Sequence, residues 1–170
     1  DGKEDISLLT RSGQAMRFSE GEVRSTGRAS TGVKGITLRP GDEVIDMVVV
    51  REDSTFLTIC ENGYGKRSGQ TEYPCKHRGG KGVIDIKTTE RNGDVVACKE
   101  VRNEEEVMVV TQNGILIRIP IEELSTIGRN TQGVKVINLG EGDRVIDMTR
   151  LPKSEEETVD PDSEQDPGDQ

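Results

Sequence analysis

The sequence predicts an all-β fold built from three copies of one four-stranded sheet. The 170-residue chain repeats itself about every fifty residues, and each repeat contains four short runs rich in valine, isoleucine and leucine. Glycine-containing turn signals separate these runs. Four-stranded sheets repeated at this period are typical of a propeller-like array, in which each sheet buries its faces against its neighbours.

The repeat rests on three residue pairs that recur in register. They are a turn dipeptide at Ser12-Gly13, Asn62-Gly63 and Asn113-Gly114, a Gly-Val step at Gly32, Gly82 and Gly133, and a Gly-Asp step at Gly41, Gly93 and Gly142. We therefore expect one domain over residues 1–152, with blades at about 5–51, 54–102 and 105–151.

The expected strands follow the same order in every repeat. They cover 6–10, 15–18, 33–38 and 44–50, then 56–60, 64–67, 83–87 and 95–101, then 107–111, 115–119, 134–138 and 145–149. The dipeptide between the first two runs predicts a two-residue type I′ turn, which needs positive φ at both central residues. A long loop separates the second and third runs, and in the third repeat residues 121–124 could form a helical turn.

The last segment of the chain differs in composition. Residues 153–170 contain eight acidic residues and one lysine, a charge of −7 that leaves −2 of the total −9 for residues 1–152. Such a segment cannot bury enough apolar surface to fold, so it is predicted to be a disordered tail. It is either a solvated tail without a task or an electrostatic competitor for the basic loops.

Several classes of site and location are disfavoured by composition. The three cysteines lack a CxxC pair, which argues against disulfides and zinc and favours a reducing, cytoplasmic compartment. With a single histidine, His77, no Ser/His/Asp or His-based metal site can form, and we expect neither a catalytic nor a metal site. No apolar run is long enough to span a membrane.

Basic, glycine-rich segments occupy the long loops and suggest a nucleic-acid interface. They read GRASTGVKG at 27–35, KHRGGKG at 76–82 and GRNTQGVKV at 128–136. Glycines allow a loop to approach a phosphate chain closely, and lysine and arginine neutralise phosphates. The alternative is a set of solubilising surface loops. The candidate DNA-binding residues are Arg24, Arg28, Lys34, Lys66, Arg67, Lys76, His77, Arg78, Gly79, Gly80, Lys81, Gly82, Arg129 and Lys135.

The strings TICENGYGKRS, EYPCKHRGGKGVIDIKTTERNGDVV and GRNTQGVKVI closely resemble the C-terminal domain of DNA gyrase A. The resemblance covers about residues 5–151 and implies three blades of a six-bladed β-pinwheel, the last three, whose basic rim binds and wraps duplex DNA. KHRGGKG resembles the family's QRRGGKG box from Arg78 to Gly82 but has Lys76 and His77 at its first two positions.

The resemblance also implies what this chain lacks and what it works with. It implies no cleavage activity and no cofactor here, with ATP and Mg²⁺ on other domains of the whole enzyme. The implied partners are DNA, the rest of DNA gyrase A and, in an A2B2 assembly, DNA gyrase B, in a nucleoid-associated setting. The alternatives are the equivalent domain of topoisomerase IV and a protein-interaction propeller; a hydrolase propeller is disfavoured because no catalytic constellation is present.

Overall fold

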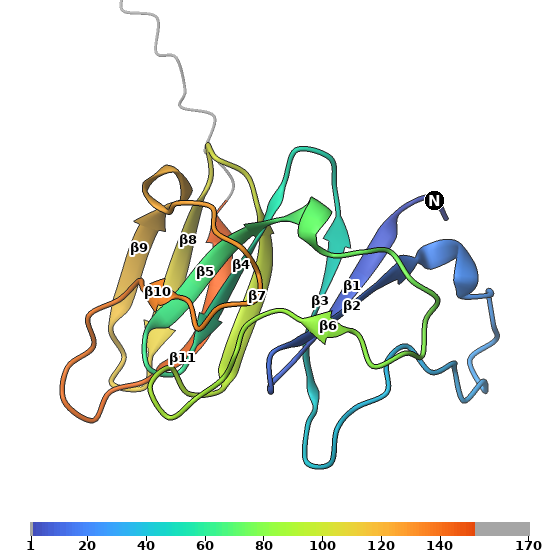
Figure 1. The fold of residues 1–170 in the computed structure, drawn as a ribbon, viewed down its shortest axis with the longest axis horizontal. Coiled ribbons are helices and arrows are strands. Elements are labelled where there is room, and N and C mark those ends of the chain that lie inside the picture. The colour runs from blue at the N-terminus through green and yellow to red at the C-terminus, as the bar shows by residue number, and fades with distance from the viewer. Residues whose placement is uncertain (1, 152–170) are drawn as a thin grey trace, which may run out of the picture.

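Three antiparallel sheets lie side by side in the computed structural model, which describes residues 2–151 (Figure 1). The predicted tail at 153–170 lies outside the described residues. The sheets contain, in order, β3-β1-β2-β6 (the first sheet), β10-β5-β4-β7 (the second sheet) and β11-β8-β9 (the third sheet). Their strands are β1 Asp5–Thr10, β2 Gln14–Ser19, β3 Val44–Val50, β4 Thr55–Cys60, β5 Tyr64–Gly69, β6 Val83–Ile84, β7 Val95–Val101, β8 Glu106–Thr111, β9 Leu116–Pro120, β10 Val134–Lys135 and β11 Val145–Leu151.

The hairpin at the start of each repeat is confirmed, but its turn differs from the prediction. β1 ends at Thr10 and β2 begins at Gln14, so the loop has three residues. In each turn dipeptide the glycine has positive φ, which is 79° at Gly13, 78° at Gly63 and 80° at Gly114. The Ser or Asn before it does not have positive φ. This arrangement is a turn followed by a left-handed glycine, which also matches the twist of a hairpin.

The third run of a repeat does not pair with its own sheet. β6 belongs to the second repeat, yet it pairs with β2 of the first through Gln14↔Ile84 and Ala15↔Val83. β10 of the third repeat likewise pairs with β5 of the second. We call these third runs the crossing runs; Figure 1 shows the green chain leaving the second sheet to place β6 beside β2. Each is shorter than predicted, because it pairs with the neighbouring sheet over two residues only.

Among residues 2–151 no sheet precedes the first sheet and no crossing run follows the third, which explains two further differences from the prediction. Residues 33–38, expected to form a strand, have no sheet ahead of them to join and form no strand. The third sheet has three described strands instead of four, because no crossing run among residues 2–151 lies beside β9.

The sheets are packed most closely through their fourth-run strands, since β7 lies beside both β3 and β11. An aliphatic core joins the second and third sheets around Leu57, Val107 and Met148, and another core joins the first and second sheets around Leu9, Val50 and Phe56. The crossing runs lie at the opposite, outer edge of the sheets. The loops that lead into the crossing runs therefore share this outer edge.

A 3-10 turn follows the second strand of every repeat. The three turns are η1 Glu20–Glu22, η2 Gln70–Glu72 and η3 Ile121–Glu123, and the third coincides with the helical turn expected at 121–124. Each turn sits where the loop leaves its sheet toward the neighbouring one. Its carbonyl groups accept hydrogen bonds from arginine side chains of a neighbouring repeat.

Candidate nucleic-acid interface

Exposed cations gather on the loops at the outer edge of the three sheets. Lys34 and Lys135 occupy equivalent positions, two residues beyond Gly32 and Gly133, and both are exposed. Arg24 and Arg28 are exposed on the first loop, and Lys76, His77 and Lys81 on the second. These seven candidates are accessible to a phosphate chain that follows the outer edge.

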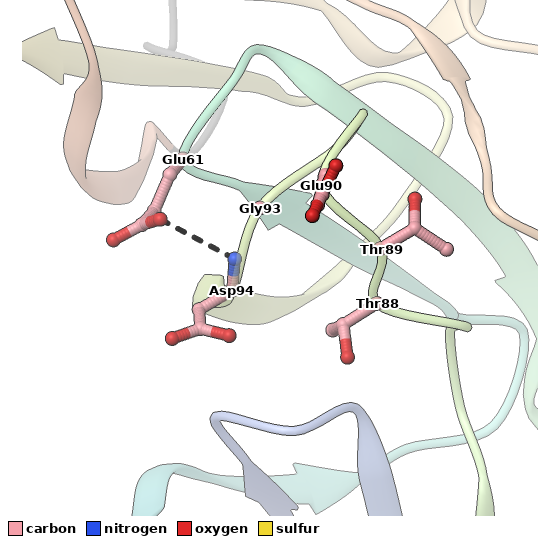
Figure 2. Close-up of a pocket in the computed structure, with 6 residues that line it drawn as sticks. All are labelled: Glu61, Thr88, Thr89, Glu90, Gly93 and Asp94. Carbon is pink, nitrogen blue, oxygen red and sulfur yellow. Dashed lines mark hydrogen bonds between the residues drawn. The ribbon is translucent and has the colours of Figure 1, made fainter.

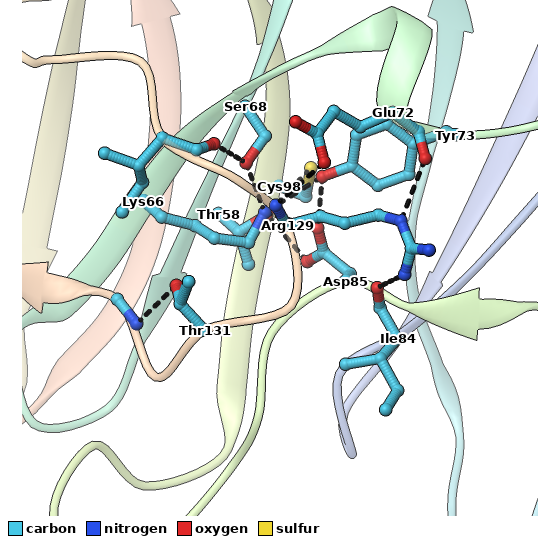
Figure 3. A network of polar contacts seen from close by, with 12 residues as sticks. Thr58, Lys66, Ser68, Glu72, Tyr73, Ile84, Asp85, Cys98, Arg129 and Thr131 are labelled. Atoms are coloured by element: carbon cyan, nitrogen blue, oxygen red, sulfur yellow. Dashed lines mark hydrogen bonds and ion pairs between the residues drawn. The ribbon is translucent and has the colours of Figure 1, made fainter.

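Lys66 is a correction to the predicted DNA-binding residues. Its side chain is fully buried, and its ammonium group donates to Asp85 Oδ1 at 2.9 Å, Tyr73 Oη at 2.9 Å and Ser68 Oγ at 2.8 Å (Figure 3). All three protons have partners, so no phosphate can reach this cation. Lys66 is a structural residue between the first and second sheets.

The remainder of this network is equally closed to solvent. Thr58 donates to Asp85 Oδ2 at 2.8 Å, and Tyr73 donates to Asp85 Oδ1 at 2.5 Å. Burial first, and then the Asp85 carboxylate, raise the pKa of the Tyr73 hydroxyl, which keeps it protonated as a donor. Because Asp85 follows β6, the network fastens the crossing run to the second sheet.

Arg67 is also buried and is likewise corrected. Its guanidinium donates to Thr55 Oγ1 at 2.8 Å and to the carbonyl oxygens of Ile121 at 3.0 Å and Leu124 at 3.3 Å. Arg17 occupies the same position one repeat earlier and donates to the carbonyls of Gln70 at 3.0 Å and Tyr73 at 3.4 Å. Both arginines therefore hold the 3-10 turn of the following repeat.

Arg78 and Arg129 reach in the opposite direction, toward the preceding repeat. Arg78 donates from Nε to the Glu22 carbonyl at 3.2 Å and from Nη1 to the Lys34 carbonyl at 3.0 Å. Arg129 makes the same two bonds one repeat later, to Glu72 at 2.8 Å and Ile84 at 2.6 Å (Figure 3). Their backbone N–H groups also donate to the Glu22 and Glu72 carboxylates. We call Arg17, Arg67, Arg78 and Arg129 the clamp arginines.

The glycines of the basic loops allow a close approach to a neighbouring strand, whereas the prediction was a close approach to a phosphate chain. A Cβ on Gly82 would lie 2.3 Å from the Ala15 carbonyl oxygen, and one on Gly133 would lie 2.5 Å from that of Gly65. Both glycines have φ of 73°. They are required for the crossing run to approach the neighbouring sheet. Gly79 donates its N–H to the Gly35 carbonyl, and the Gly80 carbonyl accepts from Thr37, so these two join the first and second loops.

Comparison of equivalent positions would have revealed the buried cation from the sequence. Lys66 stands opposite Thr58, where the other two sheets have Met16 opposite Leu8 and Ile117 opposite Val109. An apolar residue in two of three repeats indicates an inward position. The clamp arginines have no comparable signal, because donation to carbonyl groups requires no particular partner side chain.

One pocket, at the turn after the crossing run of the second repeat, is acidic. Glu61, Glu90 and Asp94 line it with Thr88, Thr89 and Gly93, and Figure 2 shows these side chains around the turn that ends the crossing segment. Glu61 accepts from the Asp94 N–H at 3.4 Å. Three carboxylates repel phosphate, so this pocket does not belong to the basic surface.

The three cysteines are free; burial raises the pKa of Cys60 to about 12 and also raises that of Cys98, so both thiols stay protonated near neutral pH. Residues 2–151 contain no cluster of metal-ligating side chains. The part of the chain that is described has no helix long and apolar enough to cross a membrane.

Comparison with known proteins agrees with this architecture. DNA gyrase A of Escherichia coli (strain K12) is 44% identical over 150 residues, which are 88% of this chain and 17% of that protein. The chain thus spans less than a fifth of this relative. A solved DNA gyrase A C-terminal domain has a TM-score of 0.82 at 28% identity, covering 88% of this chain and 51% of that one. The C-terminal domain of DNA topoisomerase IV has a TM-score of 0.83 at 24% identity, covering 89% and 47%, which shows a shared fold.

The family model described as DNA gyrase C-terminal domain, beta-propeller, matches the chain three times, at residues 4–51, 55–102 and 105–152. These matches follow the three repeats and cover most of the chain. They confirm the predicted all-β, propeller-like fold, and the chain belongs to the DNA gyrase C-terminal domain family.

Proposed function

We propose that this protein binds duplex DNA along the outer edge of its sheets and supports the wrapping of DNA by a DNA gyrase. The observation that carries the proposal is the exposure of cations on equivalent loops of successive sheets, which share one edge. A curved series of cations suits a bent duplex that is held through its phosphates, with little dependence on sequence.

The residues proposed for phosphate contact are those whose charges are exposed. They are Arg24, Arg28, Lys34, Lys76, Lys81 and Lys135, with His77 beside Lys76. Arg78 and Arg129 are left out because their guanidinium groups are used between repeats. Additional phosphate contacts around the edge would offset the cost of bending the duplex.

Salt dependence of DNA binding tests the proposal directly. If the six cations each neutralise one phosphate, log affinity should fall against log salt with a slope of about −5. Titration of a labelled duplex at several salt concentrations measures this slope. An affinity that does not change with salt would contradict the proposal.

Wrapping is tested separately by topology. A nicked circle is ligated with the protein bound, and the linking number of the closed product is compared with a circle ligated alone. A shift is expected if the duplex follows the curved edge. Binding without any shift would limit the function to DNA binding.

The remaining roles are proposed for a whole protein of the DNA gyrase A type. There this region would act beside the rest of DNA gyrase A and with DNA gyrase B in an A2B2 enzyme, in the cytoplasm and near the nucleoid. ATP and Mg²⁺ would bind on other domains. The identity to DNA gyrase A along the repeats supports this proposal.

A further inference from the structure

We propose that Arg91, stacked on Tyr64 beside Lys135, forms a further anion site that takes a backbone phosphate of duplex DNA near the hairpin turn of the second sheet. The inference rests on the proposed function, because it extends the same DNA-binding edge by one contact. Neither Arg91 nor Tyr64 belongs to the basic loops, and neither is among the residues predicted to bind DNA.

The Arg91 guanidinium lies over the ring of Tyr64, with Cζ 4.6 Å from the ring centroid. Tyr64 is half-buried, and Arg91 is exposed. An arginine that covers an aromatic ring with one face keeps its N–H groups at the rim of the guanidinium plane, where they can donate to an anion. Among residues 2–151 Arg91 has no ion pair with a carboxylate. Its charge is therefore available to a ligand.

Lys135 brings a second cation to the same place. It stands directly opposite Tyr64 where β10 pairs with β5, and residues opposite each other in an antiparallel pair project from the same face of the sheet. Lys135 is exposed and is one of the proposed phosphate contacts of the outer edge. The site at Arg91 is therefore continuous with that edge.

The Tyr64 hydroxyl shows that this place favours a negative charge. A hydrogen bond from Arg91 first, and then the charges of Arg91 and Lys135, lower the pKa of the hydroxyl, although desolvation raises it. Surroundings that stabilise a phenolate also stabilise a phosphate group, because both carry negative charge on oxygen. The stacked pair is thus suited to an anion.

The turn that carries Arg91 is held in place from two sides. Asn62 donates from Nδ2 to the carbonyls of Glu90 at 3.1 Å and Arg91 at 3.2 Å, which fixes the turn beside β5. Asn92 is fully buried and donates to the carbonyl of Gln132, in the basic loop of the third repeat, at 3.1 Å. A cation on a fixed backbone loses less conformational freedom when it binds.

The acidic pocket on the same turn limits how far a duplex can extend past this site. Glu61, Glu90 and Asp94 line the pocket, and Arg91 is not among its lining residues (Figure 2). Carboxylates repel phosphate, so a duplex that contacts Arg91 is favoured on the side of Lys135 and disfavoured on the side of the pocket.

The second repeat alone combines an arginine and an aromatic residue at these positions. Arg39 of the first repeat stands where Arg91 does, two residues before the glycine of the Gly-Asp step, and it is exposed. The residue in place of Tyr64 is Gln14, which is buried and has no ring. In the third repeat Gly140 stands in place of the arginine. Arg39 is therefore a matched control for Arg91.

The salt dependence of duplex binding tests the site. Arg91→Gln should reduce the slope of log affinity against log salt by about one unit. Arg39→Gln removes the same charge from the equivalent turn and should leave the slope unchanged. A parent chain whose affinity does not depend on salt would overturn the proposed function and this inference together. A salt-dependent parent whose slope is retained by Arg91→Gln, or reduced equally by Arg39→Gln, would overturn this inference alone.

The contribution of the ring is tested at constant charge. Tyr64→Leu removes the ring while Arg91 stays charged, and at one salt concentration it should weaken duplex binding by about two- to five-fold. Tyr64→Phe keeps the ring and should weaken binding less. If Tyr64→Leu binds as tightly as the parent, or if Tyr64→Phe loses as much affinity as Tyr64→Leu, the stacked pair is not the site.

Discussion

The Lys66 ammonium group and the Asp85 carboxylate form an ion pair at 2.9 Å, and both side chains are almost completely excluded from solvent. The pair joins β5 to the segment after the crossing run β6, at the boundary between the first and second sheets. At the equivalent positions of the third repeat stand Ile117 and Val136. The same architecture is therefore built once with an ion pair and once with two apolar residues that pack against one core.

Breaking this pair on one side should be more harmful than replacing it. Asp85→Asn leaves a buried cation without its counter-charge and should lower the free energy of unfolding by about 3–5 kcal/mol. The double variant Lys66→Met with Asp85→Val places apolar side chains at both positions, as in the third repeat, and should recover most of the lost free energy of unfolding. Urea denaturation measures both. A double variant less stable than Asp85→Asn would contradict the interpretation.

Lys81 and Lys66 should differ in their effect on DNA binding. Lys81→Gln removes an exposed charge and should reduce the slope of log affinity against log salt by about one unit. The double variant of Lys66 and Asp85 also removes a lysine but should leave the slope unchanged, because this ammonium is buried. Equal effects on the slope would show that accessibility does not decide which cations contact DNA.

The clamp arginines should affect stability more than DNA binding. Arg78→Lys keeps the charge but cannot donate to the Glu22 and Lys34 carbonyls at once in the geometry of a guanidinium. We expect a loss of about 1–3 kcal/mol in unfolding free energy and an unchanged salt slope. Arg24→Lys, on the same outer edge, is the matched control and should change neither quantity.

Alanine substitutions at Gly82 and Gly41 distinguish the steric cost of a Cβ from the conformational cost of a positive φ. Both have positive φ, 73° and 77°, but a Cβ would lie 2.3 Å from the Ala15 carbonyl oxygen at Gly82 and meet nothing within 4 Å at Gly41. Gly41→Ala should therefore cost about 1–2 kcal/mol from the left-handed backbone alone. Gly82→Ala should cost clearly more, because it also displaces the crossing run from β2. Thermal unfolding of the two variants compares them.

Asp42 should make stability depend on pH. Partial burial opposes its ionisation, but hydrogen bonds from Ser12 to the carboxylate outweigh this effect and lower its pKa. Because the folded-state pKa lies below the unfolded value of 3.8, the carboxylate stabilises the fold above that pH. This contribution is lost as pH falls through the lowered pKa. Asp42→Asn should cost about 1 kcal/mol at neutral pH and flatten the acid side of the stability profile, as measured by urea denaturation at several pH values.

Local patterns in the sequence were sufficient to predict the strands of each hairpin and the period of the repeat. They could not predict which sheet a third run joins, because residues 83–84 pair with a strand about seventy residues earlier and either sheet offers a suitable apolar face. The exposure or burial of the candidate DNA-binding residues has a similar explanation. Lys34 and Lys81 follow the rule that charged side chains stay in water, and Lys66 departs from it because Asp85 arrives from the crossing segment.

Because of the crossing runs, the boundaries of the sequence repeats do not coincide with the boundaries of the sheets. A repeat reads continuously in the sequence, but each completed sheet draws on two consecutive repeats, as the first sheet draws on residues 5–50 and 83–84. Cleavage at the junction near residue 52 would therefore leave one product with a sheet missing its outer strand and the other with a strand that has lost its sheet. Neighbouring blades are joined by backbone pairing between a crossing run and a strand of the preceding sheet. We therefore expect the blades to unfold as one cooperative unit.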